Sequence, residues 1–247
     1  MLILLVMSSL SLGGTIDPSV PDSKYRDYGS KFECVVSLKG ICCCEKKEDK
    51  HIFYASAVVI DPHWILTAAH VVSGAEDVKV SIKGKDYDIK KIIINKDFKE
   101  DEIGYHDIAL GYCESELVMD FYPKLYEKDD EVSKVVSMAG YGMTGTFSTG
   151  YVKSDGIRRA GSNIIERTER NVLVCSNSVG KKTQLEYMIA SGDSGGGLFI
   201  GNELAGINSF VMATDGKSNS DYGDECAHTR ISLYVDWVAE NMKIKTE

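Results

Sequence analysis

The sequence GDSGG, at positions 192–196, stands directly before the short apolar run GLFI at 197–200. Glycines around a serine let the neighbouring backbone N–H groups turn toward one point, and the apolar run is typical of a short buried strand. Similar short apolar or alternating runs, separated by turn-rich connectors, occur at 35–38, 52–60, 64–67, 78–82, 87–94, 108–112, 135–138, 172–175 and 204–210. Many short strands predict an antiparallel all-β architecture, either a sandwich or a barrel.

Helical periodicity is clear only near the end of the chain. Tyr234, Trp237, Val238 and Asn241 follow the i, i+3, i+4, i+7 spacing of one helix face, which predicts a C-terminal α-helix. The acidic stretch at 126–131 is the best candidate for a linker between two halves, although solvated charge runs are usually ordinary surface.

Composition limits the class of protein. With 247 residues, 43% hydrophobic and 26% charged, the chain can bury a full hydrophobic core without disulfide bridges or metal ions. It is expected to be a water-soluble globular protein. A net charge of -9 argues against nucleic-acid binding, which needs clustered Lys and Arg. A polypeptide or small molecule is the more natural partner, and the oligomeric state is left open.

The first dozen residues are apolar, but they are far fewer than the roughly 20 that span a bilayer. We therefore expect no membrane span. They fit a short secretory signal that ends near 11–13, which favours export to a secreted or periplasmic location. The alternative is an uncleaved segment that packs on the fold.

The cysteines do not form a regular pattern. They are seven in number: Cys34, Cys42, Cys43, Cys44, Cys113, Cys175 and Cys226. An odd number leaves at least one thiol unpaired. The run at 42–44 lacks the paired C-x-x-C spacing of structural zinc sites, so we interpret it as a hairpin tip and expect neither a metal nor a cofactor.

Three motifs carry the chemistry, in the order TAAH at 67–70, HDIAL at 106–110 and GDSGG at 192–196. A serine hydroxyl is a poor nucleophile, so a neutral imidazole must accept its proton, and a buried carboxylate must orient that imidazole. His70 and Asp107 fit these roles, with Ser194 as the nucleophile. The N–H groups of Gly192 and Ser194 would stabilise the developing oxyanion. Each motif alone fits a structural role equally well.

Together the motifs resemble those of the trypsin and chymotrypsin family of serine peptidases. VVSL at 35–38, AGYG at 139–142, GINSF at 206–210 and TRI at 229–231 also resemble family segments. The resemblance implies a chymotrypsin-like fold with two antiparallel six-stranded β-barrels and a C-terminal α-helix. It places a signal or pro-segment at 1–20, a first barrel with His70 and Asp107 at 21–128, and a second barrel with Ser194 at 129–247. Ser209 would bind Asp107, and residues 209–211 would pair with the substrate backbone.

Two departures from the family concern stability and activation. Positions of three family disulfides hold apolar residues, which are Ala55, Val71, Val136, Ile200 and Ala190, so packing must replace those bridges. The Ile-Val-Gly-Gly start, whose amine pairs with the aspartate before the nucleophile, is absent. That aspartate is Asp193, and it needs a cation or hydrogen-bond donors. Cleavage after Thr15 would expose Ile16, but the interval to Val35 exceeds the family pattern.

The third departure concerns specificity. By the resemblance, Met188 lies at the base of the primary pocket, where trypsin-like members place a carboxylate. Val211 and Cys226 occupy the walls and would narrow the slot beside Ser209 and Phe210. The chain is therefore expected to cleave after small or medium apolar residues.

The main alternative is a catalytically silent binding or structural protein on the same fold, because fold alone does not prove activity. An esterase or lipase of the α/β type would carry Gly-x-Ser-x-Gly with its histidine late in the chain. Here His70 comes first.

Overall fold

The computed structural model describes residues 14–43, 50–102, 104–153, 155–177, 180 and 182–243. The expected signal sequence, which ends near 11–13, and Cys44 at the expected hairpin tip lie outside the described residues.

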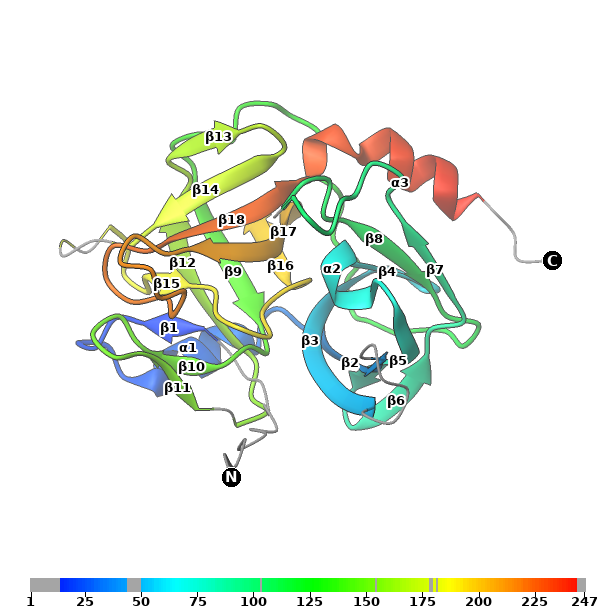
Figure 1. Cartoon of the computed structure of the whole chain (residues 1–247), viewed down its shortest axis with the longest axis horizontal. Coiled ribbons are helices and arrows are strands. Elements are labelled where there is room, and N and C mark those ends of the chain that lie inside the picture. Colours follow the sequence, from blue (N-terminus) through cyan, green and yellow to red (C-terminus); the bar gives the residue numbers. More distant parts are fainter. Residues whose placement is uncertain are drawn as a thin grey trace, which may run out of the picture.

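Two barrel-like halves lie side by side in the described part of the chain (Figure 1). The first sheet has the strand order β6-β5-β2-β3-β4-β8-β7 and is antiparallel throughout. Its strands are β2 (Val35–Cys43), β3 (Lys50–Asp61), β4 (Trp64–Thr67), β5 (Ala75–Ile82), β6 (Lys85–Asp88), β7 (Lys91–Ile94) and β8 (Ala109–Tyr112).

The segment that joins β6 to β7 closes this first barrel. β6 pairs with β5 at one edge of the sheet, and β7 pairs with β8 at the other. Between them, Ile89 N donates to Val78 O at 2.9 Å, and Lys90 N donates to Tyr112 O at 2.8 Å. The run at 87–94, expected as one strand, is therefore two strands, because the backbone changes partner after Ile89. This division brings the first sheet to seven strand segments among the described residues.

The second sheet has the order β12-β9-β16-β17-β18-β14-β13, also antiparallel. Its strands are β9 (Val135–Gly140), β12 (Arg159–Ile164), β13 (Arg167–Glu169), β14 (Val172–Ser176), β16 (Gly197–Ile200), β17 (Glu203–Met212) and β18 (Glu225–Arg230). The all-β, two-barrel fold expected from the motifs is confirmed.

A small third sheet lies beside the second barrel, with the order β11-β10-β1-β15. Its strands are β1 (Thr15–Ile16), β10 (Thr144–Thr146), β11 (Gly150–Lys153) and β15 (Tyr187–Met188). Strands of two or three residues are too short to show a pattern, and in β11 only Tyr151 and Val152 are apolar, so none of the four was expected.

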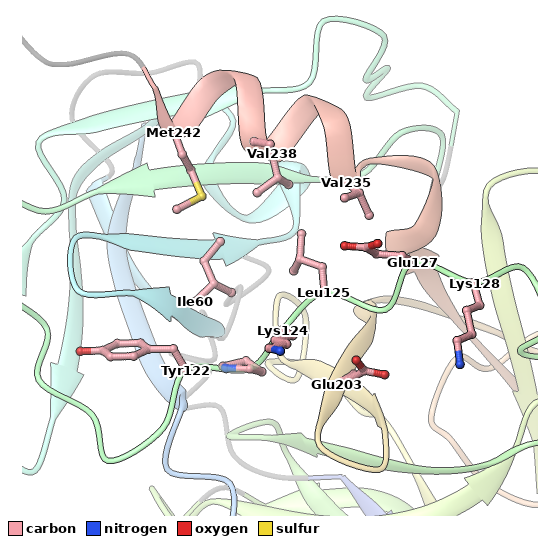
Figure 2. Close-up of a pocket in the computed structure, with 12 residues that line it drawn as sticks. Ile60, Tyr122, Lys124, Leu125, Glu127, Lys128, Glu203, Val235, Val238 and Met242 are labelled. Carbon is pink, nitrogen blue, oxygen red and sulfur yellow. The ribbon is translucent and has the colours of Figure 1, made fainter.

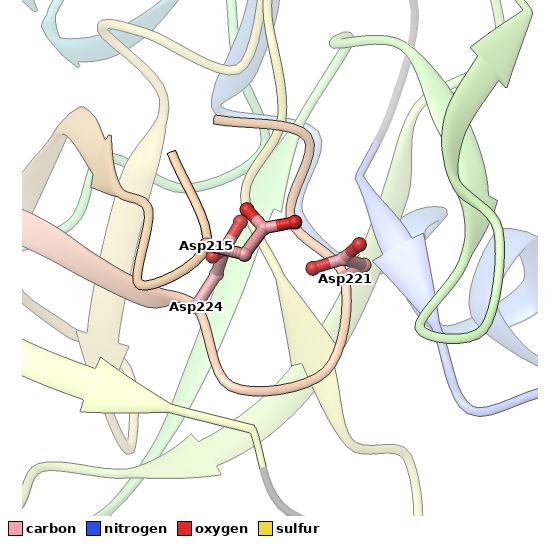
Figure 3. A group of neighbouring side chains, drawn as sticks. All are labelled: Asp215, Asp221 and Asp224. Carbon is pink, nitrogen blue, oxygen red and sulfur yellow. The ribbon is translucent and has the colours of Figure 1, made fainter. Parts of the chain in front are cut away.

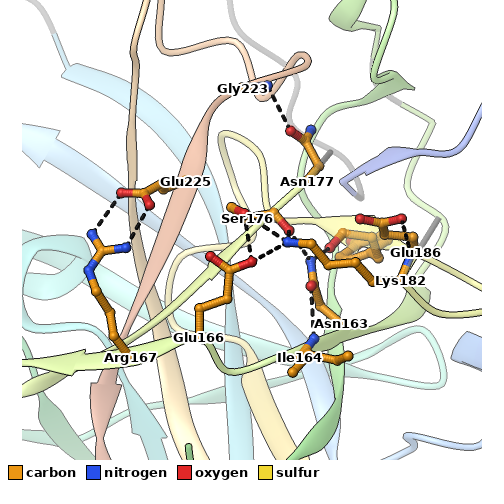
Figure 4. A network of polar contacts seen from close by, with 11 residues as sticks. Asn163, Ile164, Glu166, Arg167, Ser176, Asn177, Lys182, Glu186, Gly223 and Glu225 are labelled. Atoms are coloured by element: carbon orange, nitrogen blue, oxygen red, sulfur yellow. Dashed lines mark hydrogen bonds and ion pairs between the residues drawn. The ribbon is translucent and has the colours of Figure 1, made fainter. Parts of the chain in front are cut away.

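Polar pairs fasten the outer strands of the second barrel (Figure 4). Arg167 of β13 donates two hydrogen bonds to the carboxylate of Glu225 in β18, at 2.6 and 2.8 Å. Lys182 binds both Glu166 and Ser176. Partly exposed pairs of this kind contribute only about 0–1 kcal/mol each, so they orient the strands more than they stabilise them.

The expected C-terminal helix is α3 (Val235–Met242), which follows a short 3-10 turn, η1 (Ile231–Leu233). Tyr234 and Val238 are buried, and they belong to the apolar cluster of the first barrel. The last helix therefore crosses back from the second barrel to cover the first (Figure 1). No helix in the described residues has the length and hydropathy needed to cross a membrane.

Helix α1 (Asp22–Gly29) fills the long interval before β2. Buried Arg159 of β12 forms a two-pronged ion pair with Asp22, at 2.6 and 2.9 Å. Gly29 lies so close to β12 that an added Cβ would stand 2.9 Å from the Cα of Arg159. Only Tyr25 and Gly29 of this helix are buried, and such a polar helix carries little apolar periodicity.

Apolar packing occupies the positions where the family has disulfides. Ala55 and Val71 belong to the first core cluster, while Val136 and Ile200 belong to or pack against the second. Ala190 is 4% exposed. Five cysteines in the described residues are free thiols: Cys34, Cys42, Cys113, Cys175 and Cys226.

Candidate active site

His70 and Asp107 meet because their strands are paired. Thr67, the last residue of β4, is the register partner of Ala109, the first residue of β8. His70 follows β4 in the short helix α2 (Ala69–Val72), and Asp107 precedes β8. His70 Nδ1 lies 2.7 Å from Asp107 Oδ2, and the His70 amide donates to Asp107 Oδ1 at 2.8 Å. One carboxylate thus holds both the ring and the main chain of the histidine.

Asp107 is 1% exposed and is held from the second barrel as well. Ser209 Oγ donates to Asp107 Oδ2 at 2.5 Å, and Thr229 Oγ1 donates to the Asp107 main-chain oxygen at 2.8 Å. Burial raises the pKa of Asp107, but hydrogen bonds from His70 and Ser209 and the charge of His70 outweigh it, so this pKa lies below its usual range. The carboxylate therefore stays ionised beside His70.

Ser194 lies on the second-barrel side of the same site. Together with His70 and Gly192 it lines a hollow of about 280 Å³ between the two halves. Its hydroxyl donates to the main-chain oxygen of Ser209 at 3.2 Å. Hydrogen bonds between a catalytic hydroxyl and its base often form fully only when substrate is bound.

The amide N–H groups of Gly192 and Ser194 are available to a ligand. Gly192 has φ of 90°, a backbone conformation that favours glycine. Across the described part of the chain, neither N–H donates to a protein acceptor. Two unengaged donors beside a nucleophile are what a developing oxyanion requires.

Asp193 is fully buried, and hydrogen bonds to its carboxylate replace those that it would make with water. Gly142 N donates to Oδ1 at 2.7 Å, Ala190 N to Oδ2 at 2.8 Å, and Tyr187 Oη to Oδ2 at 3.3 Å. The amide of Gly14 is a further donor. Burial raises the pKa of Asp193 to about 6, although these four donors act in the opposite direction.

The N-terminal residue beside Asp193 is Gly14, and not Ile16, which cleavage after Thr15 would expose. Ile16 is 6% exposed and lies in β1, between β10 and β15. Gly14 has φ of 57°, and a Cβ there would stand 2.0 Å from Cζ of Tyr187. The Tyr187 ring thus fills the space next to Gly14. The sequence did not indicate this arrangement, because Tyr187 is brought to Gly14 only by the pairing of β1 with β15.

The predicted pocket residues divide into two groups. Met188 and Cys226 are fully buried, and Val211 is half-buried directly opposite Cys226 in the β17–β18 ladder. Phe210 lines a second hollow of about 220 Å³ together with His70, Asp107 and Ser209.

A buried polar chain that sequence reasoning missed lies behind Cys226. Its Sγ is 3.4 Å from His228 Nε2, and His228 Nδ1 is 2.9 Å from Asn208 Oδ1. Burial raises the pKa of the Cys226 thiol, but contacts with Cys175 and His228 outweigh it and lower this pKa to about 5. Successive side chains of a strand point to opposite faces, so Cys226 and His228 of β18 lie on the same face. The wall at Cys226 is thereby held in one orientation.

Two other features lie apart from this site. A hollow of about 650 Å³ beneath α3 has apolar residues such as Leu125 and Val238 within a charged rim (Figure 2). The carboxylates of Asp215, Asp221 and Asp224 gather in the loop before β18 (Figure 3). Asp224 accepts hydrogen bonds from two main-chain amides of its own loop, so it shapes that loop.

Comparison with known proteins agrees with this fold. A family model described as Trypsin matches residues 44–238. Brachyurin of Leptuca pugilator is 26% identical over 207 residues, which cover 76% of this chain and 87% of that protein. A solved structure described as HL collagenase superposes with a TM-score of 0.70 at 20% identity, covering 88% of this chain and 96% of the other. Mouse neuropsin, described as a serine protease, superposes with a TM-score of 0.65 at 18% identity, covering 87% and 96%.

Proposed function

Because the chain belongs to the trypsin family of serine peptidases, we propose that it is an active serine endopeptidase that hydrolyses polypeptides through an acyl-enzyme on Ser194. The observation that carries this proposal is the contact of His70 Nδ1 with buried, ionised Asp107 beside the hydroxyl of Ser194. A positioned base and a carboxylate that orients it are what an unactivated serine lacks.

In the first half of the reaction, Ser194 Oγ bonds to the carbonyl carbon of the substrate while His70 Nε2 takes the hydroxyl proton. The carbonyl electron pair moves to oxygen, where the N–H groups of Gly192 and Ser194 donate to it. Asp107 stays ionised and stabilises the imidazolium. The C–N bond then breaks, and His70 returns the proton to the leaving amine.

In the second half, a water molecule takes the place of the amine. His70 accepts a proton from it as its oxygen bonds to the acyl carbon, and the ester bond to Ser194 then breaks with return of that proton to Oγ. The cycle needs no group beyond those of the chain and water. The two halves proposed at 21–128 and 129–247 would each supply part of this machinery.

We propose cleavage after small or medium apolar residues. Met188, Val211 and Cys226 offer no carboxylate to a Lys or Arg side chain, and a cation desolvated without a partner is strongly disfavoured. The half-buried position of Val211, opposite Cys226, supports a shallow slot.

Labelling with a fluorophosphonate tests the proposed activity, because the reagent reacts with an activated serine. We expect label on the wild-type chain and none on Ser194→Ala, together with hydrolysis of a peptide substrate. A folded wild-type chain that neither takes up label nor cleaves peptides would instead be a binding or structural protein on this fold.

A further inference from the structure

Ser56 connects the first barrel to the residues around Ser194. It lies in β3 and is fully buried. Its hydroxyl donates to Gly192 O at 2.9 Å and accepts from Tyr141 N at 3.0 Å. Its own amide donates to Ser194 O at 2.9 Å. One residue of the first barrel thus binds the segment that carries the nucleophile at two points.

These contacts bear on the two peptide units next to Gly192. Met143 N donates to Ser191 O at 2.6 Å. Because a trans peptide places its C=O and N–H on opposite sides, this bond points the Gly192 N–H away from Met143. On the other side of Gly192, the hydroxyl of Ser56 holds its carbonyl oxygen. The two bonds together leave the Gly192 backbone little freedom to rotate.

Glycine is the residue for which such constraints matter most. Without a Cβ, Gly192 can adopt several backbone conformations of similar energy. A donor stabilises an oxyanion well only if it is already oriented when the charge develops. Position 55, next to Ser56, holds alanine where the resembling family has a disulfide cysteine, so a noncovalent contact must secure this part of the site.

We propose that Ser56 is a positioning residue, whose hydroxyl fixes the Gly192–Asp193 peptide and so keeps the Gly192 N–H directed at the carbonyl oxygen of the scissile bond. This inference rests on the proposed peptidase function. Ser56 takes no part in bond making itself. Its contribution belongs to the transition state, because the oxyanion exists only after Ser194 has attacked.

The test compares Ser56→Ala with Ser56→Thr, which retains a hydroxyl, and with the wild-type chain. In Ser56→Ala we expect kcat to fall by about tenfold to a hundredfold with KM changed less than about twofold, the pattern of an interaction made only in the transition state. Ser56→Thr should recover most of this loss. The affinity for a peptide aldehyde, whose adduct with Ser194 carries the oxyanion, should fall in parallel with kcat/KM.

Ser137→Ala is the matched control. Ser137 Oγ, in β9, shares a 2.7 Å hydrogen bond with Tyr28 Oη of α1, so its removal should lower the urea midpoint without changing kcat. If Ser56→Ala does not fold, Ser56→Cys fills a similar volume with a weaker donor and should lower kcat to an intermediate value.

Several results would overturn the inference. An unchanged kcat in folded Ser56→Ala, a rise of KM alone, or an equal loss of kcat in Ser137→Ala would each refute the role of Ser56 while leaving the peptidase function intact. A wild-type chain that takes no fluorophosphonate label would refute both.

Discussion

The environment of Asp193 differs strongly from that of a free aspartate side chain. It is fully buried, and its partners in the described residues are neutral N–H and O–H groups. Desolvation favours the protonated form of a carboxyl group, and the donors only partly offset it. The pKa therefore rises from 3.8 to about 6.

This shift predicts a pH dependence of stability. The folded state binds the Asp193 proton more tightly than the unfolded state does, so the free energy of unfolding should fall as pH rises from about 4 to about 6, by roughly 3 kcal/mol, and then level off. Urea denaturation of the wild-type chain and of Asp193→Asn across this range measures it. Position 193 cannot titrate in Asp193→Asn, so the free energy of unfolding of this variant should lack the fall with pH that the wild-type chain shows. Parallel curves of unfolding free energy against pH would contradict the raised pKa of Asp193.

At the scale of elements, β15, β17 and β18 build the predicted pocket from three separate parts of the chain. In this proposed pocket Val211 would narrow the slot from β17, and Met188 and Cys226 are buried. Because Val211 is only half-buried, a point mutation can shorten its side chain without opening the buried core.

For the wild-type chain we expect dominant cleavage after Ala, Val or Leu in a peptide library read by mass spectrometry. Val211→Gly should widen the slot and shift cleavage toward larger apolar residues such as Phe, while the buried base at Met188 stays the same. Dominant cleavage after Lys, Arg or Glu would show that other residues form the pocket.

The residue just before β1, Gly14, is constrained both by its backbone conformation and by the space around it. Gly14 combines φ of 57° with a close approach to the Tyr187 ring, so any side chain meets both backbone strain and a clash. Gly201 has φ of 59° but no neighbouring atom within 4 Å of an added Cβ. A substitution there therefore measures the backbone strain without the clash.

We expect Gly201→Ala to lower the free energy of unfolding by about 1–2 kcal/mol, and Gly14→Ala to lower it by about 1–3 kcal/mol more because of overpacking. Equal urea midpoints for the two variants would mean that Tyr187 moves aside without cost.

At the scale of the whole molecule, apolar packing holds together the positions that disulfide bridges join in other members of the trypsin family. Five cysteines, Cys34, Cys42, Cys113, Cys175 and Cys226, are free thiols, and the two core clusters include or contact Ala55, Val71, Val136 and Ile200. A core of this size can stabilise a chain of 247 residues without cross-links.

The urea midpoint of the chain should therefore be the same with and without excess dithiothreitol. A clear loss of stability under reducing conditions would show that a bridge involving Cys43 or Cys44 contributes to the fold.

Local sequence was sufficient for the all-β class, most of the longer strands and the terminal helix. Trp64–Thr67 and Gly197–Ile200 carry their strand signal within four residues, and the i, i+3, i+4 spacing around Trp237 and Val238 is equally local. The three chemical motifs could also be identified without coordinates, because each is contiguous. The catalytic roles of His70, Asp107 and Ser194 stay predictions until the variants are measured.

Only the tertiary structure decided what surrounds those motifs. The pairing of β1 with β15 brings Gly14 and Tyr187 to Asp193, and the meeting of the two barrels brings Ser56 to Gly192, 136 residues away. Neither contact leaves a trace in local periodicity, since strands of two residues have no pattern and a single buried serine has many possible partners. Hydrogen bonds between distant segments depend on how the barrels pack together, and that packing is a property of the whole chain.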